Sequence, residues 1–528
     1  SLALIQLGDG ASDGKSELTI DGDVNLDAIK FTDKNSKLIL KSNHSLKIET
    51  GTEGKGQVIT EGDATLIGKL GKDDTSNRIE LLTLGGDLTL GAVAAGGNPD
   101  MSAEIYASDI ISSGGAVSVI TEHNSTISGD ATVDIEFKIN NAKILTLAGG
   151  VYEVKIDGDD PDQGSLVISN DTTIKGVVGG VVNLLAVSVN ATKTLTQEAN
   201  LSAKTVTSDG NITTSSAAQI IATNINIGAG TIDATAGGNL TGDVTFTGAG
   251  TLDLGVQTLT GDVNFDGKAA TVKLDGGKIN GEIDSVLAAG GTISVTASGG
   301  EITGNVGDTN GSTLDFGNDD GALTIVGESV KISGTINDAD KGRIILAKSG
   351  NISFEGNLGS SVKPVNSFDW ADGQTLTLKN AQIYADYIDN LGNSNLANNK
   401  LIIDGDVTLG VGAAGSTNLF STIINNGKTL TLESGKFAGA IDGAAVDQGI
   451  LKITGAITAN GAIGGNKNLA KVEIAKNATL SAKNITTKDI SFEDSTATLS
   501  IGAGTLKITG ATEGKGNFET IGAATLIG

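Results

Sequence analysis

The stretch from Thr52 to Gly68 reads TEGKGQVITEGDATLIG, and the stretch from Thr512 to Gly528 reads TEGKGNFETIGAATLIG. The two align without a gap at a constant offset of 460 residues. A second pair, GVVGGVVNLLAVSV from Gly176 and GAIGGNKNLAKVEI from Gly461, shares its glycines, its Asn-Leu pair and its alternating end. Because internal repetition is the signature of solenoids and related arrays, these matches indicate a repeat fold.

A shorter motif, Gly-Asp followed by an apolar-polar-apolar triplet, recurs along the chain. It begins as GDVNL at Gly22 and returns at Gly62, Gly86, Gly129, Gly242, Gly261 and Gly405. Several of the spacings are near multiples of about 20 residues, as in repeat folds. Glycine fits a tight corner, and aspartate can cap local backbone donors there. We therefore expect a turn followed by a strand whose outer residues point inward; a ligand-binding box is the alternative.

The composition favours an all-β fold. The 528 residues include 76 Gly, no Cys and only 3% aromatic residues, yet 38% are hydrophobic. β-Branched residues pack well on pleated strands. A repeat of roughly 20 residues cannot bury its own apolar face, but stacked repeats can. The sequence predicts an elongated right-handed parallel β-helix (a β-solenoid) with a few loop excursions, and with about 20 to 26 coils at the usual strand spacing.

The charge of the chain limits its partners. The formal net charge is -26 at pH 7, which repels nucleic acid and anionic membrane surfaces and favours cations or a basic partner. No run of 18 apolar residues is present, so nothing in the sequence resembles a membrane-spanning helix.

Two segments interrupt the regular pattern and are candidate loop or side elements, near 94–113 and near 361–395. The second contains the richest aromatic patch, with Trp370, Tyr384 and Tyr387. Aromatic residues are enriched at contact surfaces, so these three are candidate partner contacts. The alternative is that the rings only fill a widened coil.

Four carboxylates crowd into the stretch DGDDPDQG, at Asp157, Asp159, Asp160 and Asp162. Hard oxygen ligands suit calcium, which makes them a weak candidate site for that ion, although Pro161 breaks the usual alternating pattern. A solvated loop is the favoured alternative. No motif frames a catalytic residue, since both histidines lie in turn-like stretches and no serine stands in a nucleophile elbow. No cofactor is required by any motif.

Several stretches resemble the passenger domains of bacterial autotransporters: GAIGGNKNLAKVEI, NATLSAKNITT, SIGAGTLKITG and TEGKGNFETIGAATLIG. The resemblance is to the rickettsial surface cell antigen and outer membrane protein B family, and it is strongest in 176–255 and 461–528. It implies a passenger exported through its own C-terminal β-barrel and displayed on a Gram-negative cell. The expected role is that of an adhesin or a component of a surface coat.

We therefore expect residues 1–528 to be a single repetitive passenger region, cut from a longer chain and holding neither signal peptide nor C-terminal barrel. It would be tethered to the outer membrane without spanning it. The leading hypothesis is a non-enzymatic extracellular scaffold and adhesin, which self-associates end-to-end or laterally and binds a host-cell receptor. The rival is a polysaccharide-degrading or proteolytic enzyme, because β-helices also carry polysaccharide lyases; scarce arginine and scarce aromatic sugar platforms argue against it.

Overall fold

A computed structural model of the chain describes residues 4–8, 16–74, 76–91, 102–215, 217–284, 291–296, 298–306, 313–315, 322–326, 329–334, 341–347, 350–371, 374–390, 400–411 and 420–528. The chain divides into two compact units. The first comprises Ser1–Asp253 with Gln257–Thr260, and the second comprises Leu254–Val256 with Gly261–Gly528.

Both units are built from parallel strands. The described residues form strands β1 to β55 and no helix. Counted over those residues, the strands stack as a β-solenoid of about 21 turns. The prediction of an all-β parallel solenoid is therefore confirmed.

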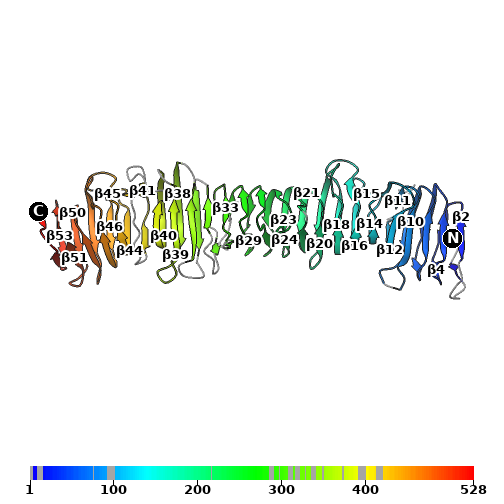
Figure 1. Cartoon of the computed structure of the whole chain (residues 1–528), viewed down its shortest axis with the longest axis horizontal. Coiled ribbons are helices and arrows are strands. Elements are labelled where there is room, and N and C mark those ends of the chain that lie inside the picture. Colours follow the sequence, from blue (N-terminus) through cyan, green and yellow to red (C-terminus); the bar gives the residue numbers. More distant parts are fainter. Residues whose placement is uncertain are drawn as a thin grey trace. The chain divides into compact units, whose positions relative to one another are not determined.

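A coil of the first unit has three short strands, one on each face. β4 (Ile29–Phe31), β5 (Lys37–Leu40) and β6 (His44–Ile48) make one coil. The next coil consists of β7 (Thr52–Glu53), β8 (Gln57–Thr60) and β9 (Ala64–Leu70). Each strand pairs in parallel with its counterpart, β4 with β7, β5 with β8 and β6 with β9. Figure 1 shows the coils of this unit following one another in chain order, with the colours running from blue to green.

The interior is a stack of aliphatic columns. Strands such as β5 and β8 alternate between half-buried and buried residues, because successive side chains point to opposite faces. Leu38 pairs with Val58, which pairs with Leu82 of β10 (Ile79–Leu84), and all three are at most 2% exposed. A column of this kind needs no large ring, which explains how a chain with few aromatic residues can fill its core.

The second unit repeats the arrangement. β46 (Ile450–Ile453), β48 (Leu469–Ile474) and β50 (Ile485–Phe492) pair in parallel, in that order. Their central residues Leu451, Val472 and Ile490 form a column with no exposed surface.

The Gly-Asp boxes connect neighbouring coils. In the box at Gly62, the triplet begins β9, with Ala64 and Leu66 buried and Thr65 between them facing outward, as predicted. The Oδ1 atom of Asp63 accepts a hydrogen bond of 2.9 Å from the backbone N–H of Asp87. Asp87, in the next box, accepts one of 2.7 Å from the N–H of Ser118. The expectation of a local cap was wrong: the donor lies one coil further on, because stacking brings that coil's corner directly above.

One box shows why its glycine is needed. Gly129 lies within β14 (Ser125–Ala131) and has φ 140°, a backbone conformation that favours glycine. A Cβ atom at this position would lie 2.2 Å from the carbonyl oxygen of Ala107 on the preceding coil. Close packing of the coils therefore requires a residue without a side chain here.

The two segments expected to leave the solenoid consist mostly of strands where the structure describes them. β12 (Ala103–Ser112) pairs with β10 and β14, and β40 (Thr375–Asn390) pairs with strands of the coils on either side. Their regular pairing places 103–112 and 375–390 in coils rather than in side elements. Residues 361–364 form a turn, and residues 94–101, 372–373 and 391–395 lie outside the described residues.

Candidate functional site

Asp157, the first of the four calcium candidates, is a structural residue. It lies in β17 (Lys155–Gly158) and is only 4% exposed. Its Oδ1 atom accepts hydrogen bonds from the backbone N–H groups of Val181 and Val182, at 3.2 and 3.4 Å. A buried carboxylate that receives backbone donors is satisfied without an ion. Asp157 thus fixes the loop of the next coil.

The other three aspartates do not join Asp157 around a common point. Asp159 and Asp160 are exposed, and the Oδ2 atom of Asp160 accepts a hydrogen bond of 2.8 Å from the side-chain amide of Asn141. Asp162 adopts a left-handed backbone with φ 57° at the end of the loop. Within the described ranges, no group of three or more acidic, His or Cys side chains is arranged to hold a metal ion. The described structure thus brings no three of these carboxylates together, and calcium binding at this stretch stays a prediction.

Asp157 belongs to a pair of stacked loops, 158–163 and 179–183, which we name the first loop pair. The N–H of Gly158 donates to the carbonyl of Val182 at 3.2 Å, so the loops lie directly against each other on consecutive coils. The exposed tip of loop 158–163 carries Asp159 and Asp160. The tip of loop 179–183 carries Val181, which is 83% exposed.

The second unit contains the same construction. Loops 443–448 and 464–468 form the second loop pair, in which the N–H of Gly443 donates to the carbonyl of Lys467 at 3.1 Å. The buried Asp442 accepts backbone hydrogen bonds from Asn466 and Lys467, at 3.0 and 3.4 Å. Sequence reasoning missed this equivalence, although the signal was present. The offset of 285 residues between Gly176 and Gly461 also aligns the two Ile-Asp-Gly and Asp-Gln-Gly motifs of these loops.

Trp370 is not a partner contact. It ends β39 (Val365–Trp370), has no exposed surface, and packs edge-on against Phe420 with ring centroids 4.8 Å apart. The alternative that this ring fills a coil is therefore correct for Trp370. The alternation of the strand points Trp370 and Phe368 to the same side, and both are buried.

The two tyrosines differ from each other. The ring of Tyr384 lies against Gly410 of β42 (Val407–Val411), where a Cβ atom would come within 2.4 Å of it. Burial raises the pKa of Tyr384, and the carboxylate of Glu433 adds to this shift. Tyr387 remains 42% exposed. Of the three aromatic candidates, Tyr387 presents the most surface to a partner.

Both arginines of the sequence bridge coils, which sequence reasoning did not foresee. Arg343, in β37 (Lys341–Leu346), donates from Nε to Ser367 at 3.0 Å and from Nη2 to the Asp369 carboxylate at 3.1 Å. Arg78 donates to the Oγ atom of Ser128 at 2.9 Å. A buried aspartate beside an arginine is a paired charge, so these contacts hold the stack together.

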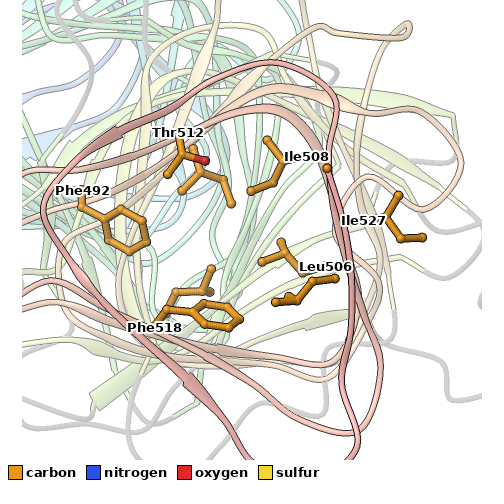
Figure 2. Close-up of a pocket in the computed structure, with 10 residues that line it drawn as sticks. Phe492, Leu506, Ile508, Thr512, Phe518 and Ile527 are labelled. Atoms are coloured by element: carbon orange, nitrogen blue, oxygen red, sulfur yellow. The ribbon is translucent and has the colours of Figure 1, made fainter.

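An apolar cavity of about 250 Å³ opens at the coil that contains Thr512–Gly528. Figure 2 shows Phe492, Leu506, Phe518 and Ile527 around it. Phe492, Leu506 and Phe518 point into the coil, and the equivalent strands β8 and β9 of the coil at Thr52–Gly68 are covered by the following coil. Thr512 is the one polar side chain among the residues that line the cavity, so it offers few groups that would orient a small ligand.

The chain is similar to a rickettsial outer membrane protein. "Outer membrane protein A" of Rickettsia rickettsii is 26% identical over 447 residues, a match that covers 70% of this chain and 19% of that protein. The chain thus spans less than one fifth of this relative's length. No protein-family model matches the sequence, and no solved structure matches it.

The similarity agrees with the coarser part of the resemblance drawn from the sequence, that to outer membrane surface proteins of Rickettsia. The narrower assignments, to autotransporter passengers and to outer membrane protein B, remain predictions. In the part of the chain that the structure describes, no helix has the length and hydropathy needed to cross a bilayer.

Proposed function

We propose that this chain is the passenger region of an autotransporter displayed on the surface of a Gram-negative bacterium. In this proposal it is a non-enzymatic scaffold of a surface layer and also an adhesin. The observation that carries the proposal is its similarity, over 70% of its length, to an outer membrane protein. The solenoid itself supports a role in binding, since stacked repeats create extended surfaces.

The outer surface supports the same role. Among the described residues, each unit exposes loop tips and single side chains on its stacked strands, such as Val181 in the first unit and Tyr387 and Val446 in the second. Surface loops on a rigid scaffold are where binding functions usually lie. The strongly acidic composition favours a host receptor with a basic face, and it makes contacts between copies sensitive to divalent cations.

Surface display is tested on intact cells with antibodies against loop 179–183, together with brief protease treatment. We expect labelling and cleavage without permeabilisation, while a periplasmic marker stays unlabelled. Labelling that appears only after the outer membrane is opened would disprove display.

Adhesion is tested with the purified chain coupled to fluorescent beads, at low and at millimolar calcium, on cultured host cells. We expect more binding than for beads coated with an unrelated protein of equal negative charge. Equal binding of both coatings would reject the adhesin role. Turnover of a polysaccharide or peptide that one Asp→Asn substitution abolishes would establish the enzyme alternative.

A further inference from the structure

The backbones of the two loop pairs share three features. In both, a buried aspartate, Asp157 or Asp442, receives two backbone N–H groups from the loop of the next coil. In both, the aspartate that ends the first loop has a left-handed backbone, with φ 57° at Asp162 and 59° at Asp447. The stacking hydrogen bonds match as well, at 3.2 and 3.1 Å.

The two loop pairs differ in which of their loops carries the charged side chains at its tip. In the first loop pair it is the earlier loop, and in the second loop pair it is the later one. In the first loop pair the earlier loop is acidic, with Asp159 and Asp160, and the later loop is apolar, with Val181 83% exposed. In the second loop pair the earlier loop carries Val446, which is 62% exposed, beside the exposed Asp447. The later loop there carries the exposed Lys467, whose amine also contacts the carbonyl of Ala444 within the pair.

The opposite order of charged and apolar loop tips determines in which relative direction the coils of two copies would fit together. If a first loop pair faces a second loop pair with the coils running in opposite directions, the order of the loops is reversed in one of them. The acidic loop 158–163 then lies opposite loop 464–468 with Lys467, and Val181 lies opposite Val446. With the coils running in the same direction, the acidic loop would face the valine of loop 443–448, and Val181 would face the lysine.

We propose that the first loop pair of one copy binds the second loop pair of another copy, with the two coils antiparallel. Opposite charges then meet at one loop and apolar side chains at the other, the complementarity that fixes register in protein interfaces. Two loop tips bury little area, so a single contact is weak. Many copies held on a surface would make it effective through multivalency.

The contact deepens the proposed function and rests on it. Copies that project from one cell surface point the same way, so an antiparallel contact joins copies displayed on facing surfaces. The partner is thus a second copy of this chain, and the expected consequence is adhesion between cells that carry it.

The register is tested by cross-linking, which is simple because the chain has no cysteine. Single variants Val181→Cys and Val446→Cys are mixed under mild oxidation. We expect a disulfide-linked heterodimer that forms at least tenfold faster than either homodimer. The matched control replaces Val181→Cys with Val362→Cys, a valine that is 80% exposed outside both loop pairs. Equal rates for the control and the test mixture would overturn the proposal.

The charge pairing is tested on beads that carry the chain in one orientation through a C-terminal tag. Wild-type beads should cluster, whereas K467E beads and D159K/D160K beads should each fail to cluster. A mixture of the two variants should cluster again, because each supplies the charge that the other needs. Clustering that K467E leaves unchanged, or a mixture that does not recover, would overturn the contact. Surface labelling of cells does not depend on either result, so failure of display and failure of this contact are distinguishable.

Discussion

The coils at Thr52–Gly68 and Thr512–Gly528 have nearly the same sequence and opposite surroundings. Leu66 is 3% exposed, whereas its equivalent Leu526 is 59% exposed. Leu66 pairs with Leu46 of the preceding coil and with Leu90 of the following coil, whereas among the described residues Leu526 pairs with Leu506 alone. Both coils contain three strands at equivalent positions. The strands β7, β8 and β9 correspond to β53 (Thr512–Gly514), β54 (Asn517–Thr520) and β55 (Thr525–Ile527).

The difference shows that the inner side chains of a coil are buried largely by the neighbouring coils. A leucine in a globular domain is surrounded by packing from many directions, but a leucine in a solenoid depends on one coil above and one below. Burial at a given position is therefore set by the neighbouring coil as much as by the residue.

The largest expected effect comes from the same substitution at the two equivalent leucines. Leu66→Ala should lower the free energy of unfolding by about 2–5 kcal/mol, because it opens a cavity between two coils. Leu526→Ala should cost less than about 1 kcal/mol, because an exposed side chain loses little by truncation. Hydrogen exchange resolved by peptide measures each coil separately, which matters because a repeat array need not unfold in one step. Equal losses of protection would contradict the comparison.

A fusion variant places a further coil after the coil at Thr512–Gly528. Residues 69–91, which contain β10 and β11 (Leu88–Leu90), cover the coil at Thr52–Gly68. Appended after Gly528, they should cover β54 and β55 and raise the cost of Leu526→Ala to about 2–5 kcal/mol. A scrambled version of residues 69–91 is the matched control. Equal protection of the β55 amides in both fusions would contradict the idea that a specific neighbouring coil buries these residues.

The sequence predicted those features that depend on local alternation. Ala64, Thr65 and Leu66 alternate as expected, because neighbouring residues of a strand always face opposite sides. The hydrogen bond from Asp87 to Asp63 could not be predicted in the same way, since the register between coils depends on loop lengths that local pattern does not encode. The expectation of a local cap failed for this reason.

The candidate site was less predictable. Composition marks Trp370 as a contact residue, yet the strand turns it inward beside Phe368. Four neighbouring aspartates resemble calcium ligands, but Asp157 is used to hold a backbone loop. In both cases the sequence showed which residue types are present, but not whether their side chains point into the coil or out of it. Whether a side chain points inward could be predicted only by following the inward-outward alternation along each strand and across the loops between strands.

A smaller effect concerns the aspartate of the Gly-Asp box, which is replaced by Ala523 in the last coil. Asp63→Ala should remove the acceptor of the Asp87 N–H and cost about 0.5–1.5 kcal/mol. Asp63→Asn keeps an acceptor oxygen and should lose less. The exchange rate of the Asp87 amide measures the contact directly. No change in that rate for Asp63→Ala would show that the box does not link the coils. In the chain of residues 1–528, Ala523→Asp should have no effect, because no described strand other than β52 pairs with β55.

The smallest expected effect is the pH dependence of the equivalent hydrogen bond between coils at Asp23, the aspartate of GDVNL. The backbone N–H of Ser45 on the next coil donates to this carboxylate at 2.8 Å and lowers the pKa of Asp23 below its ordinary value of 3.8, with His44 adding to the shift. A folded-state pKa below the unfolded value means that the contact stabilises the fold above the unfolded pKa. That contribution is lost as the pH falls through the lower, folded-state pKa. The Ser45 amide should therefore exchange faster below pH 3.8 than the intrinsic pH dependence of exchange predicts. In Asp23→Asn, whose side chain does not titrate, this additional acceleration should be absent, and its persistence there would assign the effect to another group.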